Sequence, residues 1–184
     1  TTSSEAIVTV EDNVAPVLVI KNISVQLDEN GTAKITTNDV VETATDNCAV
    51  DSITLSDNIF DCSTGTTKEV TVTVKDVNGN TTSAVAVVTI LDNKAPVVIT
   101  KDIVVELDAS GAVSITAEDV FDDAFDNCGI ASMSLDISSF GCGQEGTNFV
   151  LLSVTDFSGN VGTAEAIVEV RNSFGDNDTD GIMD

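Results

Sequence analysis

An internal repeat of about 80 residues constrains this chain more than any other feature of its sequence. The run Asp126-Asn127-Cys128-Gly129 has a copy at Asp46-Asn47-Cys48-Ala49, and aligning the two brings the rest of the chain into register without a gap. A fixed period of this size indicates a tandem array of one structural unit. We therefore predict two copies of one fold, at residues 12–91 and 92–171.

The segments outside these two repeats differ from each other in character. Residues 6–11 match 86–91 and 166–171, which end the two repeats. We interpret residues 1–11 as the closing strand of a preceding, truncated repeat, with an exposed edge able to pair with another chain. Residues 172–184 leave the period and become acidic, which indicates the start of a further module.

Alternation of apolar and polar residues predicts β-strands throughout each repeat. Val70, Val72 and Val74 alternate with threonines, as in a half-buried strand. Asn78-Gly79 follows, and Asn-Gly is the strongest short hairpin signal. Further strands are predicted at 17–20, 23–27, 33–37 and 84–90, and a short helical turn at 39–45 and at 119–125. The predicted fold class is all-β, with antiparallel β-sandwich repeats of immunoglobulin type arranged end to end.

The four cysteines fall at matching positions in the two repeats. Small domains of this size benefit from a covalent staple, and four cysteines allow three pairings. The repeat favours Cys48–Cys62 and Cys128–Cys142, because each repeat should be self-sufficient. Paired copies indicate an oxidising compartment, and the alternative is reduced cysteines in a cytosolic protein.

The net charge is −24, from 31 acidic and 7 basic residues. Nucleic acid is excluded as a default partner, because phosphate binding needs a basic surface. Adsorption to anionic lipid is disfavoured as well. The sequence also contains no apolar run of spanning length, so we expect no membrane insertion by this segment. The partners that we expect are neighbouring repeats of the same chain and surface polysaccharide.

Acidic loops are expected to meet at one end of each sandwich. Counting strands in an immunoglobulin-type sandwich brings the B–C loop, which holds Asp46-Asn47-Cys48, and the F–G hairpin, Asp76 to Asn80, back to the segment where the repeat begins. Carboxylates from these loops offer the oxygen ligands that calcium takes. The alternative is that these residues only cap turns, which Asp and Asn do by bonding their own backbone. The candidate ligands are Asp12, Asp46 and Asp76 in the first repeat and Asp92, Asp126 and Asp156 in the second.

A second candidate calcium loop lies in the tail. Asp176, Asp178, Asp180 and Gly181 match the first half of an EF-type loop, and Asp184 falls at its ninth position. The cofactor that the sequence predicts is therefore calcium.

Catalysis has little support in this composition. The chain contains no histidine, tyrosine or tryptophan, so the usual general base and zinc imidazoles are missing. Seven phenylalanines are the only aromatic residues, and we expect Phe60 and Phe140, which recur at one position, to lie in the core. We predict that the chain is not an enzyme.

The motifs resemble those of the hyalin (HYR) repeat. The resemblance rests on Ala44-Thr45-Asp46-Asn47-Cys48, on Val70 to Asp76 followed by Gly79-Asn80, and on their copies in the second repeat. Cysteines that many HYR repeats carry after the first proline and in the closing strand are absent. Acidic arrays of this kind are similar to those of flavobacterial surface adhesins, including SprB-type gliding-motility adhesins, and the tail is similar to a thrombospondin type 3 calcium repeat.

This resemblance implies an immunoglobulin-like fold, export to the outer surface of a bacterium, and a role in adhesion. The leading hypothesis is a structural segment of an extracellular adhesin filament, in which calcium stiffens the joints between repeats. One alternative is a module that binds polysaccharide directly. Another is an accessory domain of a secreted hydrolase.

Overall fold

The structure is a computed structural model that describes residues 3–173. The chain divides into two compact units, Thr1–Asp92 and Asn93–Asp184. Each unit consists of short strands with a single turn of α-helix, and the second unit adds a short 3₁₀ turn, so the predicted all-β class is confirmed. None of the helices within residues 3–173 has both the length and the apolar character that crossing a bilayer requires.

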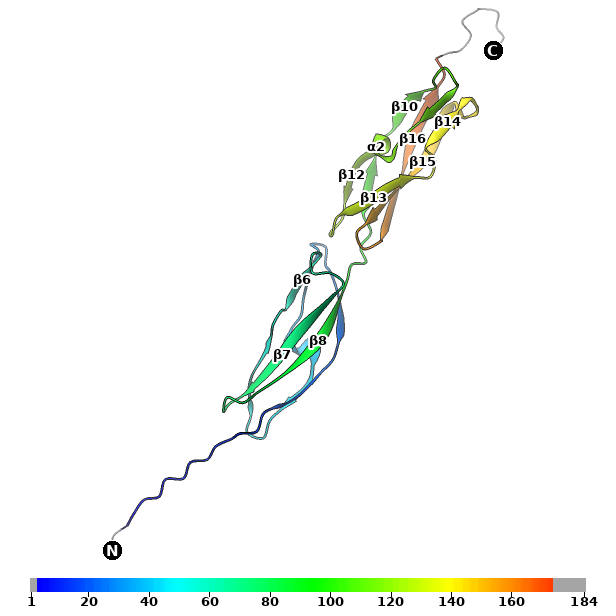
Figure 1. Cartoon of the computed structure of the whole chain (residues 1–184). Helices are drawn as coiled ribbons and strands as arrows, with labels where there is room; N and C mark the ends of the chain where they lie inside the picture. The colour runs from blue at the N-terminus through cyan, green and yellow to red at the C-terminus, as the bar shows by residue number, and fades with distance from the viewer. Residues whose placement is uncertain (1–2, 174–184) are drawn as a thin grey trace, which may run out of the picture. The chain divides into compact units, whose positions relative to one another are not determined.

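The main sheet of the first unit has four strands in the order β2-β8-β7-β5. Its centre is the hairpin of β7 (Thr67–Asp76) and β8 (Thr81–Leu91), which lie side by side in Figure 1. Strand β5 (Val50–Leu55) pairs antiparallel with β7, whereas β2 (Ile23–Gln26) pairs parallel with β8. The expected antiparallel arrangement therefore contains one parallel pair.

Two smaller ladders complete the first sandwich. Strand β1 (Val17–Ile20) pairs antiparallel with β4 (Val41–Thr45), with a register shift at Val19/Ile20. Strand β3 (Thr32–Lys34) pairs antiparallel with β6 (Ile59–Asp61).

The helical turn lies earlier than the sequence analysis predicted. Helix α1 spans Thr37–Val40, and the following residues form β4 instead of continuing the helix. The Asp39 carboxylate accepts hydrogen bonds from the Thr36 amide at 2.6 Å and from the Thr36 hydroxyl at 2.8 Å. This cap fixes the start of the helix, and pairing with β1 holds residues 41–45 extended. The prediction of a helical turn over 39–45 is therefore wrong, and so is its copy over 119–125.

The second unit repeats the first element for element, with the main sheet in the order β10-β16-β15-β13. Strands β9 and β12 pair, as do β11 and β14, and β10 is parallel to β16. The elements are β9 (Val97–Thr100), β10 (Ile103–Glu106), β11 (Ala112–Ser114), α2 (Ala117–Val120), β12 (Phe121–Phe125), β13 (Ile130–Leu135), β14 (Ser139–Gly141), η1 (Cys142–Gln144), β15 (Gly146–Asp156) and β16 (Val161–Arg171).

The core of each unit lies between the hairpin and the smaller ladders. Val70, Val72 and Val74 of β7 are fully buried, as the alternation predicted. Phe60 and Phe140 are 1% and 3% exposed, which confirms their expected place in the core. Outside the hairpin, the buried side chains of the first core include Ile35, which follows β3, Val40 of α1 and Phe60 of β6.

The hairpin turn of the first unit is a four-residue loop, residues 77–80, organised by the buried carboxylate of Asp76 at the end of β7. The Asp76 amide donates to the Asn80 carbonyl at 3.0 Å. Gly79 has a φ of 101°, which a residue without a Cβ adopts at little cost. The Asn-Gly signal in the sequence therefore reports a real turn.

The predicted strand over residues 6–11 does not form. Residues 3–16 have no regular secondary structure, and the side chains of Ile7, Val8 and Val10 are more than four-fifths exposed. A strand needs hydrogen-bonding partners along its edge, and none of the described strands pairs with this segment. Its role as the closing strand of a preceding repeat stays a prediction.

Candidate cation site

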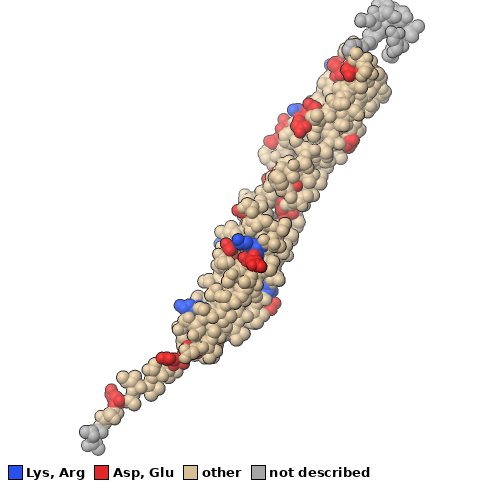
Figure 2. All heavy atoms as spheres, in the orientation of Figure 1, with Lys and Arg blue, Asp and Glu red and all other residues tan. Residues whose placement is uncertain are grey.

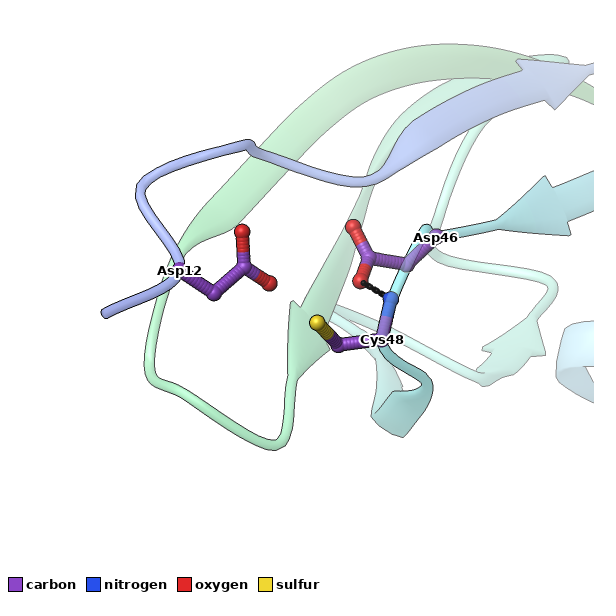
Figure 3. A group of neighbouring side chains, drawn as sticks. All are labelled: Asp12, Asp46 and Cys48. Carbon is purple, nitrogen blue, oxygen red and sulfur yellow. Dashed lines mark hydrogen bonds between the residues drawn. The ribbon is translucent and has the colours of Figure 1, made fainter. Parts of the chain in front are cut away.

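Three segments that are far apart in the sequence meet at the end of the first sandwich where the chain enters. These are the stretch before β1, the loop after β4 and the β7–β8 turn. Figure 3 shows the side chains of Asp12, Asp46 and Cys48 pointing toward one another. One ligand atom from each of these three residues lies within 4.8 Å of the others. The sequence predicted that Asp12 and Asp46 meet. It placed the loop that holds Cys48 at the same end, but it assigned Cys48 to a disulfide and not to the cation site.

Each of the two carboxylates uses one oxygen for turn chemistry. Oδ1 of Asp12 accepts from the Val14 amide at 3.0 Å and from the Asn47 side chain at 3.3 Å. Oδ2 of Asp46 accepts from the Cys48 amide at 2.8 Å, the bond drawn dashed in Figure 3. The turn-capping alternative is therefore supported for these oxygens.

The other oxygen of each carboxylate is buried and accepts no hydrogen bond. This holds for Oδ2 of Asp12 and Oδ1 of Asp46. A buried acceptor without a donor costs free energy, and such groups in native proteins generally have a partner. Turn chemistry does not account for either oxygen. The Cys48 thiol beside Asp12 offers that carboxylate a donor, whereas Oδ1 of Asp46 needs a proton, a water molecule or a cation.

Asp76 is close to this group and plays a different part. It is fully buried, and its Oδ1 accepts from the amides of Asn78 at 2.9 Å and Asn80 at 2.7 Å. Its Oδ2 accepts from the Asn80 side chain at 2.7 Å, and the same amide group contacts the Asp12 carbonyl at 3.1 Å. Asp76 thus ties the hairpin turn to the start of the repeat. The sequence signal for this role is the spacing Asp76-x-Asn78-x-Asn80.

The environment of Cys48 holds its thiol protonated. The neighbouring Asp12 carboxylate raises the pKa of Cys48 first, and then burial and the charges of Asp12, Asp46 and Asp76 add to it. The pKa of Asp12 is lowered, first by the Val14 amide and then by the Cys48 thiol. At neutral pH the site therefore holds negative carboxylates beside a neutral thiol.

The second repeat has a corresponding group made only of carboxylates. Asp92, Asp126 and Asp156 each offer an oxygen within 4.8 Å of the others. Oδ1 of Asp126 accepts from the Cys128 amide at 2.8 Å, whereas its Oδ2 is buried and accepts no hydrogen bond. The pattern of one bonded and one unbonded oxygen therefore recurs at the position that aligns with Asp46.

The predicted disulfide pairing is wrong. Cys48 and Cys142 are free thiols, whereas Cys62 and Cys128 are disulfide-bonded. The reason is geometric, because Cys48 lies beside the turn where β7 ends, and Cys62 lies near the start of β7 with its sulfur 3.6 Å from the Gly31 carbonyl oxygen. The two cysteines of a repeat are therefore at opposite ends of the sandwich.

Acidic side chains are otherwise distributed over both units. On the face shown in Figure 2 they occur singly or in small groups, with few basic residues between them. The four predicted ligands of the tail, Asp176, Asp178, Asp180 and Asp184, lie outside the described residues.

Acid is expected to destabilise both units. The backbone amide of Thr36, followed by its hydroxyl, lowers the pKa of Asp39, and Thr116 does the same for Asp119. A carboxyl whose pKa is lower in the folded state stabilises the fold above its unfolded pKa and loses this effect as the pH falls. The melting temperature should therefore fall between about pH 5 and pH 3.

Thermal melts followed by circular dichroism at pH 3–6 test this. The double variant Asp39→Asn and Asp119→Asn should melt lower at pH 6 and show a smaller change with pH. A melting temperature that rises on acidification would mean that relief of charge repulsion outweighs these hydrogen bonds.

Comparisons with known proteins identify no family. No protein-family model matches the chain, and no curated protein matches it. Among solved structures, human mucin-like protocadherin EC1-2 has a TM-score of 0.43 at 16% identity, covering 85% of this chain and 99% of that one. Drosophila N-cadherin EC1-4 has a TM-score of 0.45 at 14% identity, covering 86% and 50%. Human protocadherin-24 EC1-2 has a TM-score of 0.43 at 14% identity, covering 88% and 100%. Likenesses of this size say nothing about what the chain binds.

Proposed function

We propose that this chain is a structural segment of an extracellular adhesin filament and that its repeats bind calcium through their N-terminal loops. The observation that carries the calcium proposal is the buried, unbonded carboxylate oxygen on Asp46 and again on Asp126. Calcium takes six to eight oxygen ligands and accepts carboxylates, carbonyls and water together. The carboxylates would supply part of this shell, and backbone carbonyls and water the rest.

The donor set favours calcium over zinc. In the first repeat the Cys48 thiol could serve zinc, which binds thiolates well. In the second repeat the group consists of three carboxylates, and Cys128 is disulfide-bonded. A cation that both repeats bind must therefore accept oxygen ligands alone, which is the preference of calcium.

The filament role is supported by the repeat itself and by the chemistry that the chain lacks. Tandem repeats that contact mainly their neighbours in sequence form extended chains, and an extended chain is better suited to spanning a distance than to catalysis. The sequence contains no histidine, and disulfide-bonded cysteines are typical of proteins outside the cytosol. The resemblance to HYR repeats of bacterial surface adhesins supports the proposal that the protein lies on the outer surface of a bacterial cell. A role in gliding motility is a more specific version of this proposal.

Calcium addition should raise the melting temperature of the chain. At a calcium concentration well above the dissociation constant we expect a rise of about 5–10 °C. The double variant Asp46→Asn and Asp126→Asn should abolish most of it. Asparagine keeps one oxygen for the amide of Cys48 or Cys128, and its NH₂ group replaces the unbonded oxygen. Calorimetric titration with calcium and with magnesium measures binding directly.

Asp57→Asn is the control, because Asp57 is exposed and lies outside both carboxylate groups. It should leave the calcium effect unchanged. Equal calcium binding by the wild type and the double variant would refute the site. Small-angle scattering with and without a chelator tests stiffening of the joints, and an unchanged maximum dimension would remove that role.

A polysaccharide-binding module is the second candidate. Phe125, Phe149 and Phe157 are 58%, 60% and 74% exposed, and exposed aromatic faces can stack on sugars. The aligned residues in the first repeat are Thr45, Glu69 and Val77, so the feature is not shared by both copies. A glycan array probed with the wild type and with Phe157→Ala distinguishes this candidate. An accessory domain of a secreted hydrolase is the third, and no described residue favours it.

A further inference from the structure

The turn after β7 presents an Asn-Gly pair to solvent. Asn78 and Gly79 are both exposed, and a Cβ built on Gly79 would meet no atom within 4 Å outside its chain neighbours. Within residues 3–173, Asn78 makes its hydrogen bond through the backbone amide, and its side-chain amide group has no partner. The Gly79 amide donates to the Asp76 carbonyl at 3.4 Å, which is long for such a bond. Neither group is therefore held firmly away from the other.

These two groups are the ones that react when an asparagine loses its side-chain amide. The glycine nitrogen gives its proton to a base and attacks the side-chain carbonyl carbon of the asparagine. A C–N bond forms, a succinimide ring closes, and ammonia leaves with a proton from solvent. Water then opens the ring at either carbonyl, which gives aspartate or isoaspartate. Glycine favours the attack because no Cβ shields its nitrogen.

We propose that Asn78 is a site of spontaneous deamidation in the folded protein and that the fold protects Asn30, the asparagine of the other Asn-Gly pair. Gly31 is buried, and its amide donates to the Asp28 carbonyl at 3.0 Å. The Asn30 side chain hydrogen-bonds the Asp28 carboxylate. Both reacting groups at Asn30 must therefore give up a partner before they can meet.

The second unit contains the same turn without the reactive side chain. Ser158 and Gly159 stand at the positions that align with Asn78 and Gly79. Gly159 has a φ of 90°, and its amide also donates to the Asp156 carbonyl at 3.4 Å. A serine hydroxyl offers no carbonyl carbon for the attack. Of two turns with the same backbone geometry, the first is therefore chemically labile and the second is not.

Isoaspartate at position 78 would lengthen the main chain of the turn by one methylene group. Asn80 lies just beyond the insertion, and its backbone amide and side chain each donate to the Asp76 carboxylate at 2.7 Å. The same side chain reaches the carbonyl oxygens of Asp12 at 3.1 Å and Val14 at 3.2 Å. Displacing Asn80 therefore loosens the turn from the start of the repeat. An aged sample should show a lower melting temperature for the first unit and an unchanged one for the second.

Peptide mapping of the aged full chain tests the proposal. The purified protein is incubated in mildly alkaline buffer, and samples taken over time are digested and analysed by liquid chromatography and mass spectrometry. We expect Asn78 to convert about tenfold faster than Asn30, because the hydrogen bonds that hold Asn30 and Gly31 must break first. The rate at Asn78 should rise with pH, since a base removes the glycine proton. Labelling with an isoaspartate-specific methyltransferase identifies the isoaspartate fraction.

Incubation in denaturant is the matched control, because it removes the fold and leaves the sequence unchanged. Asn30 and Asn78 should then convert at similar rates. Equal rates in the folded chain would overturn the proposal, and so would an Asn78 that converts only after unfolding. An Asn30 that still lags in denaturant would show that its sequence neighbours protect it, which would overturn the assigned role of the fold.

The variant Asn78→Ser copies the turn of the second unit and should abolish the age-dependent fall in melting temperature. A fall of the same size in this variant would overturn the proposed effect on Asn80. The reaction needs water and a base but no cation, so its failure would leave the proposed function standing.

Discussion

Replacing Phe60 with alanine is expected to lower the free energy of unfolding of the first unit by about 3–5 kcal/mol, the usual cost of removing a buried phenyl ring. Phe60 is among the largest fully buried side chains of that unit, and its ring leaves a cavity that a closely packed core fills only in part. Chemical denaturation followed by circular dichroism measures the loss. The second unit supplies an internal reference, because its own transition should not move.

The matched control is Phe157→Ala, a change of the same size at a side chain that is 74% exposed. It should alter stability by about 0.5 kcal/mol or less. A loss of similar size for both variants would show that the core does not centre on Phe60. A shift of both transitions by Phe60→Ala would show that the units do not unfold independently.

Replacing Asp76 with alanine is expected to lower the melting temperature of the first unit by about 10 °C. Three donors lose their acceptor in this variant, namely the amides of Asn78 and Asn80 and the side chain of Asn80. They point toward a fully buried position that water does not reach. Burial raises the pKa of Asp76, and the hydrogen bonds from Asn80 and Asn78 more than offset it, so the folded protein holds this carboxyl ionised.

Asp28→Ala is the control for burial. Oδ1 of Asp28 also accepts from the amides two and four residues later, at 2.9 and 3.0 Å, but this turn is exposed. Water can replace the lost acceptor there, so the melting temperature should fall much less. Equal losses in thermal melts of the two variants would mean that turn geometry, and not burial, sets the importance of Asp76.

Local patterns predicted those parts of the fold that local physics determines. The valine alternation predicted β7, and Asn78-Gly79 predicted the turn after it, because period and turn residue are both properties of neighbours in the chain. The helical turn was misplaced, although Thr36 and Asp39 have the spacing of a capping box. Pairing of β4 with β1 is a long-range property, and no local pattern reports it.

The cysteine pairing shows how a short separation in sequence can mislead. Cys48 and Cys62 are close along the chain, yet β5 and β6 between them carry the chain along the sandwich from one end to the other. A bridge between them would need a reversal that this segment does not make. The meeting of the Asp12 and Asp46 carboxylates could be predicted, because counting strands placed both residues at one end of the sandwich. Which oxygen of each carboxylate accepts a hydrogen bond depends on how the turn folds, and no sequence pattern reports it.

The parallel pairing of β2 with β8 has a mechanical consequence. Strand β2 lies near the start of its repeat and β8 at its end, and residues 23–26 are in register with 88–91. Tension applied through the chain would pull these two strands in opposite directions along their own length. Their hydrogen bonds would then be loaded in shear and would have to break together, whereas a hairpin pulled from one end opens bond by bond. Strands β10 and β16 repeat this arrangement. Each repeat therefore contains its own parallel strand pair that resists stretching.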